Sequence, residues 1–231
     1  MHIGVCGFCE KRQSIYKDFD ALELQNTFYD FVREEWLKKL REESKDFEFT
    51  LKALQIITHK KDSPTYRRYR SSLGNMDNYG NFRDTEEVNE AMRVMLSYAS
   101  ILNSKVIIFQ TPPSFSENDE NIKNIYEFFK RYRKNNIIYG WENRGKWNSD
   151  TLKEIFESLG IIHVVDPFFS ESITKEMRYF RLHGKGGYSY SYTNDDLMYL
   201  KGKVKNGDYI MFNNTNMCND ARSFRKMIHE I

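Results

Sequence analysis

No apolar stretch in this 231-residue chain approaches the roughly 18 residues that a membrane-spanning helix needs. Its three cysteines are too few for the disulfide framework of a small secreted domain. The first residues, MHIGVCGF, also lack the basic and then apolar layout of a signal peptide. We therefore expect a cytoplasmic protein with no membrane association.

The chain has no marked excess of charge of either sign. It carries 35 Lys and Arg against 33 Asp and Glu, a formal net charge of +2. This charge balance does not indicate any particular class of partner, so a nucleic-acid interface would have to be a local basic patch. No linker, repeat or low-complexity tract divides the sequence, which favours a single domain over residues 1–231.

What the chain does contain is a series of short apolar runs, most of which stop at or near a polar residue. The eight runs are, in order, HIGVCG, ALELQ, FEFTLKA, KVIIFQ, NIIYGWE, GIIHVVD, RYFRLHG and DYIMFNN. Segments with helical periodicity lie between or after them, at 31–45, 85–103, 118–134, 149–159, 194–201 and 219–231. Strands that alternate with helices in this way predict parallel pairing through right-handed crossovers.

These elements predict an α/β fold, a single TIM-like (β/α)8 barrel. We expect a short first crossover, because 8–20 is too irregular for a full helix, and a long third crossover after Ile57. The alternative is a doubly wound open sheet, which usually has five or six strands and a glycine fingerprint after the first. The segment GVCGFCEK lacks that glycine spacing, so the barrel is favoured.

The polar ends of the runs predict where the protein works, because barrels carry their chemistry at the carboxyl ends of their strands. Side chains alternate between the faces of a strand, so Glu23 shares a face with Gln25, and Arg181 shares one with His183. Burying such groups is costly unless they are paired, so a network of them at strand ends more often serves a site than a structural role. As catalytic acid and base groups we expect Glu23, Glu142, Asp166 and His183.

The remaining polar residues near the strand ends favour an anionic substrate. Lys52, Arg144 and Arg181 would bind its phosphate or carboxylate group. Lys185 lies in the loop HGKGGYSY after the seventh run, where barrels often bind phosphate, although GKGG alone also fits an ordinary turn. Further substrate-binding candidates are His59, Gln110, Asn213 and Asn214.

Two other functions fit the same sequence. The four acid and base candidates would also suit a divalent metal in a hydrolase or isomerase, but the nearby cations would weaken metal binding, and we assign no cofactor. The segment from Tyr66 to Arg70 interleaves aromatic rings with arginines, as non-catalytic binders of nucleotides or single strands do. A solvated helix face is the favoured interpretation of that segment.

The cysteines leave a redox or metal role open. Cys6 and Cys9 form a C-x-x-C motif, which needs a helix N-terminus or two further ligands for such a role. Only Cys218 remains in the chain. In a closed barrel the first and eighth strands would be neighbours, which would bring Cys218 close to Cys6.

An ordered set of blocks in the chain resembles the DUF72 family of YecE-like proteins. The blocks are LELQNTFYDF, FTLKALQIITHKK, IIFQTPPSF, WENRGKW, RYFRLHGKGGYSY and YIMFNNTNMCNDARSF. The resemblance implies a TIM-like barrel with a polar mouth, in a family whose biochemical activity is not established.

The resemblance also implies a set of polar positions. They are Glu23, Lys52, His59, Gln110, Glu142, Arg144, Asp166, Arg181, His183, Asn213 and Asn214. The chain departs from the family at Phe8, where a tryptophan is usual, and its first loop is shorter. It also has Gly145 where a histidine usually follows the arginine, which leaves His183 and His59 as the candidate imidazoles.

Overall fold

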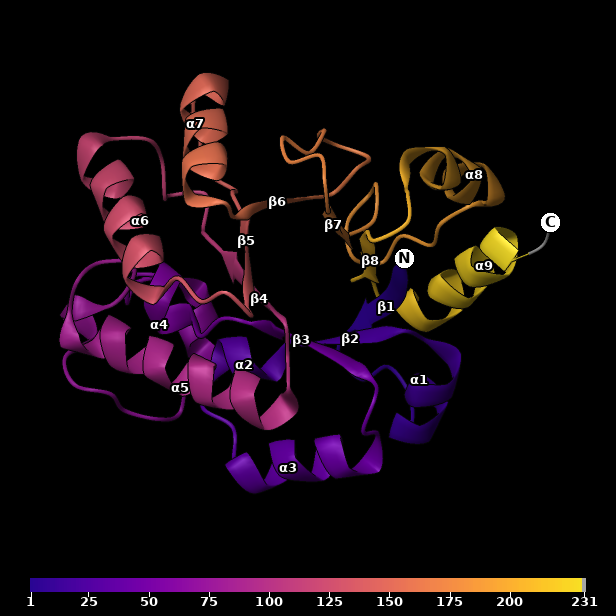
Figure 1. The fold of residues 1–231 in the computed structure, drawn as a ribbon, viewed down its shortest axis with the longest axis horizontal. Coiled ribbons are helices and arrows are strands. Elements are labelled where there is room, and N and C mark those ends of the chain that lie inside the picture. Colours follow the sequence, from indigo (N-terminus) through magenta and orange to yellow (C-terminus); the bar gives the residue numbers. More distant parts are fainter. Residues whose placement is uncertain (230–231) are drawn as a thin grey trace. The chain divides into compact units, whose positions relative to one another are not determined.

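The computed structural model describes residues 1–229, and in it eight parallel strands close into a barrel in chain order (Figure 1). The strands are β1 (His2–Cys6), β2 (Ala21–Leu24), β3 (Glu48–Lys52), β4 (Val106–Gln110), β5 (Ile138–Glu142), β6 (Ile162–Val165), β7 (Tyr179–Leu182) and β8 (Tyr209–Phe212). Each strand lies within one of the eight apolar runs. The predicted TIM-like α/β barrel is therefore confirmed.

Every strand but β6 is followed by at least one helix; within the described residues, no helix lies between β6 and β7. The helices are α1 (Arg12–Asp18), α2 (Asn26–Tyr29), α3 (Glu34–Glu43), α4 (Gln55–Thr58), α5 (Glu86–Leu102), α6 (Asp119–Tyr132), α7 (Ser149–Leu159), α8 (Asn194–Lys203) and α9 (Met217–His229). The first crossover holds only the seven-residue α1. The long third crossover contains α4 and two 3₁₀ turns, η1 (Pro64–Arg68) and η2 (Met76–Asn78), before α5. The last two positions of the predicted helix 219–231 lie outside the described residues.

The chain packs as two compact units. The first comprises Met1–Glu23, Asp46–Glu48 and the chain from Val164 onward, and the second comprises Leu24–Lys45 and Phe49–His163. In the first unit, α9 packs against β1, β8 and α8 (Figure 1). In the second unit, α5 packs against α3 and α4. The single domain over residues 1–231 stays a prediction.

Strand register in the first unit stacks aromatic rings at one level and brings two strand backbones close together at the next. His2, Tyr209 and Tyr179 are register partners, with ring centroids 4.3 Å and 5.3 Å apart. Two residues further along β1, a Cβ at Gly4 would lie 2.2 Å from the carbonyl oxygen of Ala21. Because glycine has no side chain, β1 and β2 can approach each other at this level.

The strands of the second unit separate an apolar face from a polar one. Phe109 of β4 lies 5.6 Å from Phe128 and 5.3 Å from Phe129 on α6, measured between ring centroids. Gln110 and Glu142, the next residues on β4 and β5 after this aromatic layer, are register partners. Since successive side chains point to opposite faces, the aromatic core and the polar strand ends lie on different sides of the sheet.

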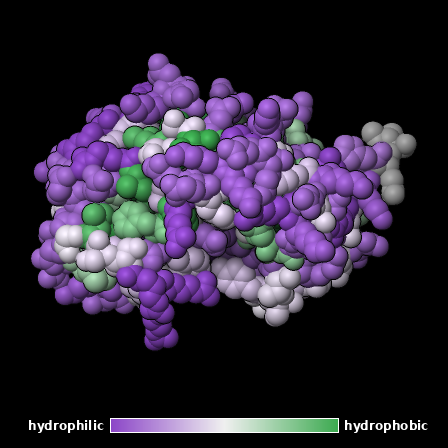
Figure 2. Space-filling model, turned by 90° about the horizontal axis from the view of Figure 1, so that it is seen from below, coloured by the Kyte–Doolittle hydropathy of each residue, from purple (hydrophilic) through white to green (hydrophobic). Residues whose placement is uncertain are grey.

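Large exposed apolar side chains among residues 1–229 are few, and all belong to the first unit. They are Phe169, Tyr188, Met198 and Tyr199. The face shown in Figure 2 is mostly hydrophilic, with small hydrophobic areas. Within the described part of the chain, no helix is both long enough and apolar enough to cross a membrane.

A disulfide joins Cys9, just after β1, to Cys218, at the start of α9. The sequence suggested that Cys218 would lie near Cys6, but its bonded partner is Cys9. Cys6 is buried at the end of β1, in register with Glu23 of β2. The bond closes a covalent loop across a sequence separation of 209 residues.

Reducing this disulfide should destabilise the protein by about 2–4 kcal/mol, because a long closed loop restricts the unfolded chain. The measurement is urea unfolding with and without dithiothreitol. The double variant C9S/C218S should unfold at the midpoint of the reduced wild type and show no further effect of reductant. The control C6S should keep the full response to reductant. An unfolding midpoint that is the same in both redox states would contradict the prediction.

Candidate functional site

The predicted site residues fall into two clusters at carboxyl strand ends, one in each unit. The cluster of the first unit contains Glu23, Asp166, Arg181, His183, Lys185, Asn213 and Asn214. The cluster of the second unit contains Lys52, His59, Gln110, Glu142 and Arg144.

A fully buried ion pair joins β2 to β7 in the first unit. The Arg181 guanidinium donates from Nε to Glu23 Oε2 at 3.0 Å and from Nη2 to Oε1 at 2.8 Å. The Tyr179 hydroxyl donates to Glu23 Oε2 at 2.9 Å. Both ionic side chains are 0% exposed, so each depends on the other for the interactions that water would otherwise supply. Neither side chain is exposed in this structure, and a direct substrate contact by either one stays a prediction.

His183 is oriented by its neighbours at the end of β7. Its Nδ1 lies 2.8 Å from the Arg181 carbonyl oxygen, and its backbone N–H donates to Asp166 Oδ2 at 2.8 Å. Because a carbonyl oxygen only accepts, Nδ1 carries the hydrogen, and Nε2 of the neutral ring is the proton acceptor. Asp166 also accepts from the Phe168 backbone N–H at 3.1 Å. Asp166 therefore positions the backbone of His183, as an orienting carboxylate would.

Lys185 is engaged by the start of α8. Its ammonium donates to Asp196 Oδ1 at 2.8 Å, and the Tyr190 hydroxyl donates to Oδ2 at 2.6 Å. Asp196 and Thr193 also form the capping box of α8. Burial works to raise the pKa of Asp196, but these hydrogen bonds outweigh it and lower that pKa to about 2. The loop lysine thus stabilises a helix N-terminus in this structure.

Asn214 connects the loops that follow β7 and β8. Its Nδ2 donates to the Tyr190 carbonyl and to Asp220 Oδ2, both at 2.6 Å. Its buried Oδ1 accepts no hydrogen bond from residues 1–229. Asn213 lies beside it, and its backbone N–H bonds the carbonyl of Leu182. Asn214 therefore keeps one acceptor for a water or ligand donor.

In the second unit, Lys52 and His59 both pack against the ring of Phe28. The Lys52 ammonium lies 3.9 Å from the centroid of the Phe28 ring, a cation–π distance. The His59 ring lies 5.1 Å from the same centroid, in an edge-on arrangement. His59 Nδ1 is 2.8 Å from Thr58 Oγ1, and the Tyr66 hydroxyl donates to the His59 carbonyl at 2.9 Å.

His59 is held in its neutral form. Burial, together with the positive charges of Lys52 and Arg144, lowers its pKa to about 3. The electrostatic effect also shows that both cations lie near this imidazole. His59 is only 2% exposed, so it is not the solvated loop histidine that its neighbours Lys60 and Lys61 suggest.

Arg144 reaches back to the end of β5. Its Nε donates to Glu142 Oε1 at 2.8 Å, and its Nη2 lies 2.8 Å from the same oxygen. The Arg144 side chain is 32% exposed, whereas that of Glu142 is 8% exposed. Gln110 is the register partner of Glu142 on β4. The cluster therefore presents a partly exposed cation beside a sheltered carboxylate.

Gly145 explains one departure from the family pattern. A Cβ at this position would lie 1.9 Å from the Phe115 carbonyl oxygen. The same carbonyl accepts a hydrogen bond from Trp147 Nε1 at 2.8 Å, and the Lys146 carbonyl accepts one from the Glu117 N–H at 3.0 Å. The two loops lie so close that no side chain fits at 145, a histidine included.

The aromatic rings of the segment from Tyr66 to Arg70, in the third crossover, are not accessible for stacking. Tyr66 and Tyr69 are each 9% exposed and pack against Tyr79, with ring centroids 5.8 Å and 6.3 Å from it. The arginines among them are exposed, and Arg68 lies over the ring of Tyr29. The rings that would stack on bases are thus used to hold the loop together.

No group of three or more His, Cys, Asp or Glu side chains within residues 1–229 is arranged to hold a metal ion. The predicted metal ligands of the first unit are instead engaged separately, Glu23 by Arg181 and Asp166 by backbone N–H groups. The geometry therefore gives the metal-dependent alternative no support.

Two residues that contact the predicted site residues were not identified from the sequence. Tyr179 donates to Glu23. Strand alternation could have identified it, because it shares a strand face with Arg181 two residues later. Phe28 lies under Lys52 and His59. It follows the second strand within the block LELQNTFYDF, but nothing in its local sequence distinguishes it from a core aromatic residue.

Comparison with known proteins gives a family and a fold. Residues 12–231 match a family described as "Protein of unknown function DUF72". A DUF72 protein crystal structure from Enterococcus faecalis is similar with a TM-score of 0.72 and 14% identity, covering 99% of this chain and 94% of that one. One from Thermotoga maritima has a TM-score of 0.67 and 18% identity, covering 99% of both chains. No curated protein matches the chain.

Removing one partner of the buried ion pair should destabilise the first unit strongly. The variant E23Q replaces the carboxylate that pairs with Arg181 by a neutral amide, at a cost of about 3 kcal/mol or more. Chemical unfolding at pH 7 measures the effect. The double variant E23L/R181M removes both charges at similar volume and should be less destabilised than E23Q. Equal stability of E23Q and the wild type would show that the pair does not carry this role.

Two buried histidines should make the protein less stable in mild acid. Burial lowers the pKa of His163, which packs on Phe156, to about 4, and that of His59 to about 3, from the usual 6.5. Below pH 6.5 the unfolded chain binds protons that the folded histidines do not. Stability is therefore lost as pH falls from 6.5 towards these values, by about 1.4 kcal/mol per pH unit for each histidine.

The measurement is the unfolding free energy at several pH values between 7 and 4.5. The variant H163F keeps an aromatic ring against Phe156 but cannot titrate, so its stability should vary less steeply with pH. An H163F profile that is parallel to that of the wild type would contradict the assignment.

Proposed function

The chain belongs to the DUF72 family, and we propose that it is an enzyme that performs acid/base chemistry on an anionic, phosphate-bearing or nucleotide-like substrate at the carboxyl ends of its strands. The observation that supports this most is the cluster of the second unit. There Lys52 and Arg144 both lower the pKa of His59, and Arg144 binds the carboxylate of Glu142. A positive field, a sheltered carboxylate and a neutral imidazole are the parts that such chemistry requires.

Arg144 is the proposed anion contact. Its guanidinium has five N–H donors in a planar fork, and Glu142 engages one edge of it. The side chain is 32% exposed, so this planar fork of donors is accessible to a phosphate or carboxylate oxygen. Lys52, on its aromatic support, adds positive charge that favours the same anion.

Glu142 is the proposed base. It accepts a hydrogen bond from Arg144, and a substrate anion that competes for Arg144 would release the carboxylate to accept a proton. Its position at the end of β5 is the place where a barrel presents catalytic groups. Gln110, in register with it, and the neutral His59 would supply hydrogen bonds to the substrate.

In the first unit, His183 is the proposed acid or proton shuttle. The Arg181 carbonyl determines its tautomer, so Nε2 is the nitrogen that exchanges a proton. Asp166 positions it, and the buried pair of Glu23 and Arg181 holds the strand from which it projects. Lys185, Asn213 and Asn214 stay proposed substrate contacts of the neighbouring loops.

The proposed location is the cytoplasm. The Cys9–Cys218 disulfide argues against this location, because stable disulfides are uncommon in reducing compartments such as the cytoplasm. Trapping the thiols of the protein in intact cells would show whether the bond is formed there.

The function is tested by ³¹P NMR on a panel of sugar phosphates and nucleoside monophosphates. If the wild type converts a member of the panel, E142Q should lose turnover by about a thousandfold or more while still binding that compound, because it lacks the base. R144Q should mainly weaken binding. The control K39Q, at an exposed lysine on α3, should behave as the wild type.

Turnover that is unchanged in E142Q would remove Glu142 from the mechanism. Binding that R144Q weakens, without turnover of any compound, would instead favour a non-catalytic nucleotide-binding protein. Circular dichroism of each variant separates loss of function from loss of fold.

A further inference from the structure

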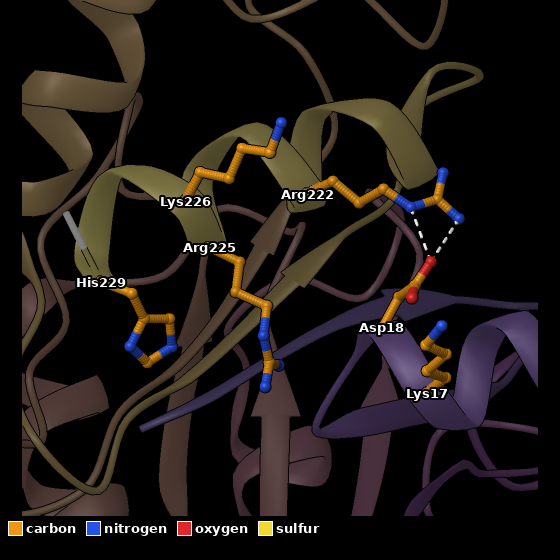
Figure 3. Close-up of a pocket in the computed structure, with 6 residues that line it drawn as sticks. All are labelled: Lys17, Asp18, Arg222, Arg225, Lys226 and His229. Carbon is orange, nitrogen blue, oxygen red and sulfur yellow. Dashed lines mark hydrogen bonds and ion pairs between the residues drawn. The ribbon is translucent and has the colours of Figure 1, made fainter.

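A groove between α1 and α9 in the first unit lies apart from the strand-end residues. It has a volume of about 370 Å³ and is lined by Lys17, Asp18, Arg222, Arg225, Lys226 and His229 (Figure 3). The α1 residues come just before β2 begins, so they lie near its amino end. The groove is therefore distinct from the proposed catalytic cluster at the carboxyl ends.

The lining is strongly basic. Four of the six residues come from α9, at spacings of three, four and seven residues from Arg222, which places them on one helix face. Lys17 adds a cation from α1, and Asp18 is the one acidic side chain of the lining. Between Asp220 and the end of α9 at His229, the sequence contains no acidic residue.

The two arginines are held in place by carboxylates. Arg222 donates from Nε to Asp18 Oδ2 at 2.8 Å and from Nη1 to Glu10 Oε1 at 2.8 Å. Arg225 donates from Nη1 to Asp20 Oδ1 at 2.7 Å. Arg222 Nη2 also pairs with Asp18 Oδ2 at 2.8 Å and with Glu10 Oε2, so all three nitrogens of that guanidinium are engaged, whereas Arg225 keeps further N–H donors. These ion pairs fix the orientation of both guanidinium groups.

The other basic residues of the groove, Lys17, Lys226 and His229, form no ion pair with any residue in 1–229. Lys17 and Lys226 are exposed cations on facing helices. An anion bound in the groove would give these ammonium groups a counter-charge.

We propose that this groove binds a small anion that carries two or more phosphate groups, such as pyrophosphate or a nucleoside diphosphate. From position 222 to position 229, α9 rises by about 10 Å, so a single phosphate cannot meet the cations at both ends. Two linked phosphates can contact an arginine already oriented by its carboxylates and the lysines opposite. An open groove with flexible lysines also suits a ligand whose remaining part stays in solvent.

The test is isothermal titration of the full chain with pyrophosphate at low salt and pH 7. The wild type should bind, and K17A/K226A should bind about tenfold more weakly or worse, with an unchanged thermal transition. The matched control K39A/K153A, which removes two exposed lysines on α3 and α7, should bind as the wild type. Binding should weaken as salt is added.

R144Q separates this groove from the catalytic proposal, since it alters the second cluster and should leave pyrophosphate binding here intact. The proposal is overturned if the wild type shows no binding, or if K17A/K226A binds as tightly as K39A/K153A. It is also overturned if orthophosphate binds as well as pyrophosphate, or if only a single-stranded oligonucleotide binds.

Discussion

The ion pair between Glu23 and Arg181 is the constraint on which the polar arrangement of the first unit depends. A carboxylate and a guanidinium with no exposed surface are costly to bury unless they are paired, and here two hydrogen bonds join them while Tyr179 adds a third to the carboxylate. Once Arg181 is fixed, its carbonyl is fixed too, and that carbonyl determines which nitrogen of His183 carries the proton. The tautomer of the partly buried His183 thus rests on a buried charge pair.

Local pattern was sufficient for much of the fold. The run that ends in Glu142 became β5, and the helix expected at 149–159 has those same bounds. Asn118 and Thr85, which began their predicted helices, are the side chains that cap them. Strand alternation also identified the face on which Glu23, Arg181 and Lys52 lie. These features depend on near neighbours in sequence, which periodicity and capping chemistry report directly.

Contacts between residues that are far apart in the sequence could not be predicted from such local patterns. Arg181 seemed free to bind an anion, but its partner Glu23 stands 158 residues earlier, and only closure of the strands brings the two together. Cys218 is bonded to Cys9 and not to Cys6, and this pairing depends on the path of the first loop. The burial of Tyr66 likewise depends on packing with Tyr79 rather than on its own neighbours.

The disulfide gives the molecule a topology that its linear sequence does not have. With Cys9 bonded to Cys218, the chain between them is a covalent ring with two short tails. A single peptide bond cut in the long crossover between α4 and α5 would open the ring without releasing a fragment. The protein could therefore be nicked there and still migrate as one species until a reductant separates its pieces.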